Sequence, residues 1–378
     1  MSSAPSSSSE SVSEDNSRQP DPVVPMLACE RESPRPCINQ ALVDALAPIR
    51  AYRFLKFGTQ HEKSIAYATA ISAIIGAPFK IETVKQARKL PKIGEKIITK
   101  VDEFLRHGYI QESRDVVEQD DYKTLALLQT INGIGYHKAN ELYEQGIRTL
   151  DDLVTAHPEF IPRVRYHHHL QQKIPRSEVE SIMAYVKLQL DKVQPGSHLE
   201  ACGGYRRGKE FSNDVDILIT WPHNEGAERG VLKKLVKRLQ VKGFIPPDGL
   251  LGASEAGSQR IITANRPATQ LDALDKALII FRHPPNGTTR PEAMFRRVDL
   301  VVSNWENWGC ALVGWTGSTQ FERDLRRYCK TRDIRFDSGG LRNELTDEVI
   351  RGDFSQEKEV FRYLDLPWLP PHVRNADP

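Results

Sequence analysis

The stretch that decides the fold is Gly203-Gly-Tyr-Arg-Arg-Gly208, followed closely by Asp214-Val-Asp-Ile-Leu-Ile-Thr220. The second part is typical of a β-strand, and successive side chains of a strand point to opposite faces. Asp214 and Asp216 therefore share one face. Two carboxylates this close among apolar neighbours are costly unless cations neutralise them. The stretch predicts a site for two Mg²⁺ ions, which sit roughly 3.5–4 Å apart in phosphoryl-transfer enzymes.

The glycine-rich part predicts a phosphate contact. Glycines let backbone N–H groups approach phosphate oxygens, and Arg206 and Arg207 add charged donors. A third carboxylate is needed beside the nucleophile, and Asp299 in Arg297-Val-Asp-Leu-Val-Val302 is the best candidate. The alternative is that the aspartates are surface carboxylates of an edge strand, paired with the arginines. The glycine–arginine turn directly upstream favours the metal site.

Downstream and upstream patterns predict a mixed sheet around this stretch. Strands are expected near Leu199 and at Asp214–Thr220, Arg260–Thr263, Ala277–Phe281 and Arg297–Val302. Helices are expected from Gly230 to Lys242 and from Ser318 to Arg332. The part from Gly252 to Asp275 has little regular pattern, so we expect a long excursion inside the sheet.

The first half of the chain is expected to be helical. Apolar residues recur at helical spacing in Ala41–Phe57, Ile65–Ile75, Thr83–Leu90, Gly94–His107 and Tyr136–Gln145. In the first four of these helices and their turns, Lys and Arg outnumber Asp and Glu, which indicates a surface that faces phosphates. Residues 1 to 36 are rich in Ser, Pro, Glu and Asp, so a disordered tail is expected there.

Composition excludes several classes of protein. The net charge of +2 over 378 residues excludes a uniformly basic nucleic-acid coat, so DNA contacts must come from local patches. The five cysteines are odd in number and include no C-x-x-C pair, which argues against a disulfide framework or a zinc site. No apolar run is long enough to span a bilayer, and no signal-peptide pattern occurs. A soluble intracellular protein without membrane contact is expected.

Three segments resemble family X DNA polymerases. Gly203 to Thr220 is similar to the nucleotide- and metal-binding signature of that family. Its Gly203-Gly204 matches the branch of polymerase mu and terminal transferase, whereas the beta and lambda branch carries Gly-Ser. The other two segments are Gly314-Trp-Thr-Gly-Ser318 with Phe321-Glu-Arg-Asp-Leu-Arg-Arg-Tyr328, and Leu369-Pro-Pro-His-Val-Arg-Asn-Ala376. The resemblance covers roughly residues 37 to 378.

The resemblance implies roles for residues of the polymerase site. It makes Asp214, Asp216 and Asp299 the ligands of Mg²⁺, with Mn²⁺ as a substitute, and places Asp299 beside the primer 3′-hydroxyl. It implies that the incoming nucleotide is bound by Gly203, Gly204, Arg176, Arg207, Gly314 and Trp315. Glycine at position 314, where the beta and lambda branch has Tyr, implies weak discrimination between deoxynucleoside and ribonucleoside triphosphates.

The resemblance also implies DNA contacts. The turns Leu90–Gly94 and Ile131–Gly135 resemble helix-hairpin-helix turns, whose N–H groups, such as those of Gly133 and Gly135, bind phosphate without reading sequence. The carbonyls of Gln129, Ile131 and Ile134 match a Na⁺ or K⁺ site of the family. Arg323 and Arg326 would face the minor groove, the alternative being a solvated basic helix face. Lys63, Tyr67 and Lys96 match a pocket for a DNA 5′-phosphate.

A second activity rests on Lys100. Lys92, Lys96 and Lys100 recur at a spacing of four and share a helix face, so repulsion and partial burial are expected to lower the pKa of one amine. Lys100 stands where beta and lambda carry the lysine of the 5′-deoxyribose-phosphate lyase reaction, whereas mu lacks it. Glu62 and Glu112 replace basic residues of beta. The alternative is that the lysines only grip phosphate.

These observations predict an α+β multidomain polymerase. The expected parts are a tail (1–36), a helical lyase-like domain (37–118), helical fingers (119–195), a mixed-sheet palm (196–308) and a thumb (309–378). The expected reaction is DNA-directed addition of nucleotides to a primer 3′-hydroxyl in gapped or broken DNA, during break repair in the nucleus, by a monomer. No BRCT domain is seen, which leaves recruitment by end-joining factors open.

Three alternatives to this function stay open. The first is template-independent addition, which Gly252–Asp275 favours because it matches a long loop of the mu and terminal-transferase branch. Asn213, where that branch has His, argues against it. The second is a non-catalytic DNA-binding scaffold, and the third is an RNA-tailing nucleotidyltransferase.

Overall fold

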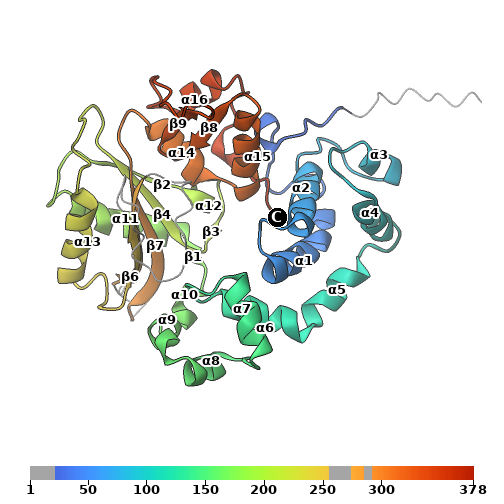
Figure 1. Cartoon of the computed structure of the whole chain (residues 1–378), viewed down its shortest axis with the longest axis horizontal. Helices are drawn as coiled ribbons and strands as arrows, with labels where there is room; N and C mark the ends of the chain where they lie inside the picture. Colours follow the sequence, from blue (N-terminus) through green and yellow to red (C-terminus); the bar gives the residue numbers. More distant parts are fainter. Residues whose placement is uncertain (1–21, 255–273, 285–291) are drawn as a thin grey trace, which may run out of the picture.

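The computed structural model describes residues 22–254, 274–284 and 292–378. In Figure 1 the chain forms four groups of elements arranged around the centre of the view. The first helices lie on the right, the next helices below, the main sheet on the left, and the C-terminal elements above. The strand expected at Arg260–Thr263 and most of the Gly252–Asp275 excursion lie outside the described residues.

The first group is a helical domain with its own core. It contains α1 (Gln40–Phe57), α2 (Glu62–Ile75), α3 (Val84–Arg88), α4 (Glu95–His107) and α5 (Gln111–Glu118), so the four helices expected here are confirmed. Buried side chains such as Leu46, Ile71 and Ile98 pack together between these helices. Thr83 is the N-cap of α3 and forms a capping box with Gln86, so these two residues determine where the helix starts.

The second group holds the other helix-hairpin-helix turn. It contains α6 (Asp120–Gln129), α7 (Tyr136–Glu144), α8 (Leu150–Ala156), η2 (Pro158–Phe160), α9 (Ile161–Val164) and α10 (His167–Leu170). Gly133, in the turn between α6 and α7, has φ +88°. Lys92 in the first helix-hairpin-helix turn has φ +60°, in the left-handed region where glycine is favoured. Lys92 therefore adopts a backbone conformation that is uncommon for a residue with a side chain.

The palm is a five-stranded mixed sheet in the order β2-β4-β7-β6-β5. Its strands are β2 (His198–Ala201), β4 (Val215–Thr220), β5 (Leu250–Ser254), β6 (Asp275–His283) and β7 (Met294–Val302). Strands β4 and β7 run parallel, and the other pairs are antiparallel. Helices α11 (Arg176–Leu190) and α13 (Val231–Val241) pack on one face, against residues such as Ile217 and Leu300. A short ladder joins β1 (Ile174–Pro175) to β3 (Phe211–Ser212).

The thumb follows the palm. It contains α14 (Trp308–Thr316), α15 (Thr319–Lys330), β8 (Ile334–Asp337), β9 (Gly340–Asn343), α16 (Glu357–Tyr363) and η4 (Pro371–Val373). Helix α14 covers the other face of the palm sheet, where Trp308 and Ala311 contact Leu218 and Val301. The palm sheet is therefore covered on both faces, which suits the apolar runs of β4 and β7.

The expected disordered tail is wrong for residues 22–36. Ala28 and Cys29 are buried in the thumb core, and the Ala28 N–H donates to Asp324 at 2.9 Å. The Arg31 side chain is buried over Gly76 and donates to Ser72 Oγ at 3.0 Å. This segment has few apolar residues, but those few and one arginine fit sites on two other domains, which local composition does not reveal. Residues 1–21 lie outside the described part.

The thumb and the helical domain contact each other directly. Arg50 of α1 pairs with Asp377 near the C-terminus at 2.8 Å, and Arg323 of α15 donates to the Thr59 carbonyl at 3.1 Å. In Figure 1 the C-terminus lies between α1 and the thumb. These contacts close the four groups into a ring. Within the described ranges no helix is long and apolar enough to cross a membrane.

Candidate active site

The sheet brings two of the three expected carboxylates side by side on one face. Asp216 in β4 and Asp299 in β7 are register partners in parallel neighbouring strands, and Asp214 directly precedes β4. Val215 and Ile217 point to the opposite face and are buried against α11 and α13. The alternation expected from the sequence therefore separates the acidic face from the apolar core of the palm.

The surroundings of these carboxylates disfavour negative charge. Burial raises the pKa of Asp299 to about 6, against the opposing effect of Arg297, and Asp214 adds to the rise. Burial raises the pKa of Asp216 well above its ordinary range, and Asp214 and Asp299 raise it further. Asp299 is 7% exposed, and its Oδ1 accepts no hydrogen bond from the described residues. A cation bound between these carboxylates would favour their charged forms.

Arg297 is a site residue that the sequence reasoning left without a role. Its guanidinium pairs with Asp214 and approaches Asp299, with Nε 3.4 Å from Oδ1. Arg297 and Asp299 are two residues apart in β7, so strand alternation already places them on one face. This spacing alone predicts that Arg297 lies at the acidic site.

The donor set fits hard divalent cations. All three side chains offer carboxylate oxygens, which Mg²⁺ prefers. The Oδ1 of buried Asp299 accepts no hydrogen bond within the described residues, although the Arg297 guanidinium lies near it. As the side chains stand, the described residues hold no group of three or more His, Cys, Asp or Glu arranged around one point, and Asp214 is turned to Arg297 instead. Metal binding would therefore require Asp214 to exchange Arg297 for the cation.

The glycine-rich stretch forms a helical turn against the carboxylates. It folds as α12 (Gly203–Arg206). Gly203 has φ +56°, and a Cβ there would overlap Asp216 Oδ2, so the position needs glycine for both reasons. Arg206 pairs with Glu357 of α16 at 2.7 Å, and Arg207 donates to the Thr316 carbonyl at the end of α14. The two arginines therefore attach the turn to the thumb.

Arg176 holds the turn from behind. Its guanidinium lies 3.7 Å from the centre of the Tyr205 ring and donates to the carbonyls of Tyr205 at 2.8 Å and Lys209 at 3.2 Å. The side chain lines none of the cavities described below. With these contacts Arg176 supports the turn, and the direct contact with the triphosphate that was expected of it stays a prediction.

A cavity of about 730 Å³ adjoins Asp216. Its lining includes Gly314 and Trp315 of α14, Arg207 and Lys209 of the palm, and Arg326 of α15. A cavity of this size fits a nucleotide. The Trp315 indole N–H has no acceptor among the described residues. A Cβ at Gly314 would overlap Ser338 Oγ, so a larger residue there requires Ser338 to move.

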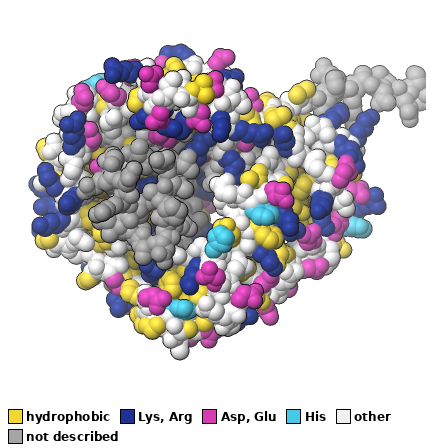
Figure 2. Space-filling view, in the orientation of Figure 1, with side chains coloured by type: hydrophobic (Ala, Val, Ile, Leu, Met, Phe, Trp, Pro, Cys, Tyr) yellow, Lys and Arg dark blue, Asp and Glu magenta, His cyan; other side chains and the backbone are white. Residues whose placement is uncertain are grey.

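The two thumb arginines have different surroundings. Arg326 pairs with Glu322 at 2.9 Å and lines the nucleotide-sized cavity, while Arg323 reaches the helical domain at Thr59. Figure 2 shows Lys and Arg side chains crossing the face above the grey region, over α12 and α15. A net charge near zero is thus compatible with a local basic band.

The expected lyase pocket contains a competing carboxylate. Lys100 lies 3.2 Å from Glu112 and 3.4 Å from Glu103, and Arg53 lies 3.2 Å from the other oxygen of Glu112. Burial lowers the pKa of Lys100, but Glu112 and Glu103 together raise it overall. The prediction of a lowered pKa is wrong for Lys100, because acidic neighbours from α4 and α5 outweigh the effect of burial.

Among the other expected residues of this pocket, Tyr67 lies close enough to Lys100 and Glu112 for their charges to act on the pKa of its hydroxyl. Tyr67 is buried beside Arg53, whose guanidinium lies 5.9 Å from its ring centre. Lys63 lies over the Phe57 ring at 5.0 Å, and Lys96 is exposed one turn before Lys100. Among the described residues, no hydrogen bond or ion pair joins Lys63 or Lys96 to Lys100, whose partners are Glu103 and Glu112.

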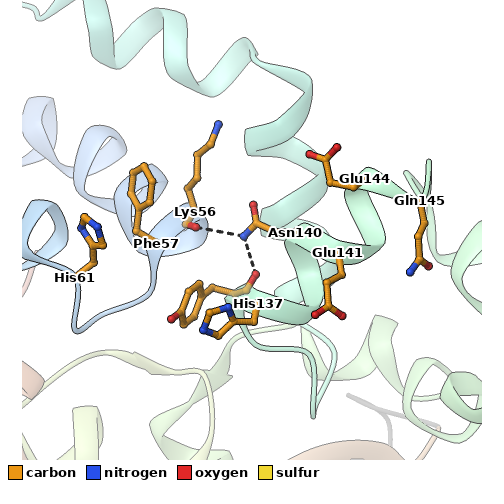
Figure 3. A pocket seen from close by; sticks show the side chains of 9 residues that line it. Lys56, Phe57, His61, His137, Asn140, Glu141, Glu144 and Gln145 are labelled. Carbon is orange, nitrogen blue, oxygen red and sulfur yellow. Dashed lines mark hydrogen bonds between the residues drawn. The ribbon is translucent and has the colours of Figure 1, made fainter.

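Two further hollows border the helix-hairpin-helix elements. One of about 490 Å³ is lined by Gln129, Ile131, Gly133 and Ile134 on one side and by Arg297 on the other. The cation site at the carbonyls of Gln129, Ile131 and Ile134 stays a prediction. Figure 3 shows the other, between the α1–α2 turn and α7, where Asn140 donates to the Lys56 carbonyl at 3.2 Å. It contains none of the three carboxylates.

Domain comparisons match the four groups. The helix-hairpin-helix domain matches residues 37–110, the fingers domain of DNA polymerase lambda 126–165, the DNA polymerase beta palm 173–304, and the DNA polymerase beta thumb 311–375. A palm with three acidic residues on adjacent strands, held between helix-hairpin-helix domains and a thumb, defines a nucleotidyltransferase of the DNA polymerase class.

Whole-chain comparisons specify the family. Human DNA-directed DNA/RNA polymerase mu is 32% identical over 367 residues, which is 93% of this chain and 72% of that protein. Human DNA nucleotidylexotransferase is 27% identical over 367 residues, covering 93% and 71%. DNA polymerase lambda of Arabidopsis thaliana is 28% identical over 354 residues, covering 90% and 63%. The chain belongs to family X of the DNA polymerases, which depend on divalent metal ions.

Proposed function

We propose that this polymerase fills short gaps and joins broken ends during the repair of DNA double-strand breaks, in the nucleus, with Mg²⁺ as its metal. The observation that carries the proposal is the Asp216–Asp299 register pair, in an acidic face that opens onto a nucleotide-sized cavity. The ring of four domains and the basic band over α12 and α15 support binding of a DNA end or gap.

The reaction is attack of the primer 3′-hydroxyl on the α-phosphorus of a nucleoside triphosphate, with release of pyrophosphate. Asp214, Asp216 and Asp299 would hold the metal ions, which when bound lower the pKa of the hydroxyl and balance the charge of the transferred phosphate. Asp299 is the carboxylate nearest the primer hydroxyl in this assignment. Arg207 and the N–H groups of the Gly203 turn would orient the triphosphate, so the protein acts mainly by positioning.

The proposal includes weak discrimination between the deoxyribose and ribose sugars of the incoming nucleotide. Gly314 leaves the wall of the cavity without a side chain beside the expected sugar position, and Trp315 lies next to it. We therefore include ribonucleoside triphosphates among the substrates. Manganese is expected to substitute for magnesium, because both accept carboxylate oxygens.

Primer extension on a duplex with a one-nucleotide gap and a 5′-phosphate tests the proposal. Wild type is compared with Asp216→Asn and with Asp151→Asn, an exposed aspartate of α8 that serves as the control. We expect template-directed addition by wild type and by Asp151→Asn, and loss of at least about a hundredfold in Asp216→Asn. DNA binding without any addition by wild type, with Mg²⁺ or Mn²⁺, would instead favour a non-catalytic scaffold.

The same assay with a single-stranded primer tests template-independent addition. The likeness to human DNA nucleotidylexotransferase keeps this candidate open. Asn213 is exposed at the edge of the site, and its side chain accepts a hydrogen bond from Lys173. Robust addition without a template, lost when residues 255–273 are deleted, would make terminal transfer the main activity.

A further inference from the structure

The N-terminal segment, residues 22–36, is fixed to three parts of the molecule, and we call it the N-terminal strap. Val24 packs with the core of the helical domain, whereas Ala28 and Cys29 pack in the thumb core. Ser33 exchanges backbone hydrogen bonds with the C-terminal residues, donating to the Val373 carbonyl at 2.6 Å and accepting from the Asn375 N–H at 2.9 Å. These anchors hold the backbone on the N-terminal side of Arg35.

The strap delivers Arg35 to a cavity beside the Gly203 turn. This cavity of about 450 Å³ is lined by four cationic side chains, Arg35, Lys173, Arg207 and Lys209, and by the backbone of Gly204. Glu210 and Asp214 are the carboxylates in its wall. Arg207 and Lys209 also line the nucleotide-sized cavity that contains Asp216, Gly314 and Trp315. The two cavities therefore meet at these two cations.

The four cationic side chains outnumber the two carboxylates in the wall of the smaller cavity, and Asp377 is a further acidic group that acts on Arg207 and Lys209. Arg35 is exposed and makes no ion pair or side-chain hydrogen bond with any residue in the described ranges. Burial, followed by repulsion from Arg207 and Arg35, lowers the pKa of Lys209 to about 8. Cations that weaken one another in this way are stabilised when an anion binds between them.

We propose that Arg35 is a further phosphate-binding residue of this polymerase, and that it holds the terminal phosphate of the incoming nucleoside triphosphate and the pyrophosphate that is released. The nucleoside would occupy the larger cavity, and the polyphosphate would extend past Arg207 and Lys209 into the smaller one. This inference rests on the proposed function, because it needs a triphosphate at the Gly203 turn.

The proposal gives the strap a part in catalysis. An arginine fork suits phosphate oxygens, and one charge-assisted hydrogen bond changes affinity by about tenfold. The strap packs on both the thumb and the helical domain. Arg35 would therefore bind the last phosphate only when these two domains are arranged as in this structure. Arg35 touches the phosphate in this scheme, whereas Arg31 and Ser33 only position the strap.

Steady-state extension of a gapped duplex tests the role of Arg35. Arg35→Ala and Arg35→Lys are compared with wild type and with Arg351→Ala, an exposed arginine of the thumb outside these cavities. We measure KM for the nucleotide, product inhibition by pyrophosphate, and the Kd for the gapped DNA. Arg35→Ala should raise KM and the pyrophosphate inhibition constant by about tenfold each, with unchanged Kd for DNA. Arg35→Lys should recover part of the loss, and Arg351→Ala should match wild type.

The outcomes separate this inference from the proposed function. An unchanged KM with a raised Kd for DNA would show that Arg35 binds a DNA phosphate, and unchanged values throughout would make it an ordinary surface arginine; either result overturns the inference. An equal loss in KM and DNA affinity, with a lowered melting temperature, would mean that the strap is only structural. Failure of wild type itself to extend the primer would overturn the proposed function instead.

Discussion

Glu357 is the residue whose loss should most weaken the joint between palm and thumb. It lies in α16 and is 5% exposed. One carboxylate oxygen accepts from Arg206 of the Gly203 turn and the other from Arg374 near the C-terminus, each at 2.7 Å. Arg374 is fully buried between aromatic rings, with its guanidinium 4.9 Å from the Phe361 ring centre. Glu357→Gln would leave buried Arg374 without a counter-charge, and Arg206 with only its pair to Glu200, at 3.2 Å.

The expected loss is large because the ion pairs are buried. Removal of one partner from a buried pair typically costs about 3–5 kcal/mol, since it leaves an uncompensated charge in the interior. For a cooperative unit of 150–250 residues, each kcal/mol lowers Tm by about 2–4 °C. Glu357→Gln should therefore lower the Tm of the palm and thumb by roughly 6–20 °C. Glu359→Gln, in the same helix but in an exposed pair with Arg362, should cost less than about 1 kcal/mol.

Thermal denaturation followed by intrinsic tryptophan fluorescence provides the measurement, because Trp368 packs on Phe361 and Arg374. Burial disfavours the charged form of Glu357, but Arg374 and Arg206 lower its pKa overall. A lowered carboxyl pKa contributes stability above the unfolded value of about 4.3 and loses it as the pH falls further. The gap between Glu357→Gln and wild type should therefore be full at pH 7 and narrow below about pH 4. A Tm for Glu357→Gln within 2 °C of the Glu359→Gln control at pH 7 would refute the reasoning.

Three further predictions concern the active site and the helical domain. Gly203→Ala should reduce primer extension at least tenfold without loss of DNA binding, because its Cβ overlaps Asp216; extension at the wild-type rate would contradict this. kcat/KM for the nucleotide should fall above about pH 8, where Lys209 loses its proton, and Lys209→Arg should remove that fall; a pH profile with the same fall in both proteins would exclude Lys209 as the cause. Trapping of a Schiff base on 5′-deoxyribose-phosphate DNA by borohydride should be weak in wild type and stronger in Glu112→Gln, because Glu112 holds Lys100 as a paired cation; strong trapping in wild type that Lys100→Ala abolishes would establish the lyase.

Helices and strands with strong patterns were predictable because their signals are local. The apolar spacing of Ala41–Phe57 and Gly230–Lys242 anticipated α1 and α13 to within a residue or two. Alternation in Asp214–Thr220 placed both aspartates on the face of β4 that points away from α11 and α13. Short elements such as β5 (Leu250–Ser254) and α9 were not predicted, since they have too few residues to show a period.

Contacts between distant segments were not predictable in the same way. The N-terminal strap has a composition typical of disorder, yet its few apolar residues fill gaps in two other domains. Lys100 has other lysines at helical spacing, yet a glutamate from α5 decides its pKa. For Ala28 of the strap the partner Asp324 is 296 residues away, so no local window contains the information. Glu112 is close to Lys100 in the sequence, but the turn between α4 and α5 decides whether the two side chains meet.

The sequence by itself determined the family, the order of the domains and the identity of the three carboxylates, because these depend on residue types at short spacing. Only the tertiary structure decided what those residues face. It set Asp216 opposite Asp299, turned Arg297 toward Asp214, placed Arg176 behind the turn, and carried Arg35 to the edge of the site. The physical reason is that charge and burial act through space, so the chemistry of each side chain is set by neighbours that only folding brings together.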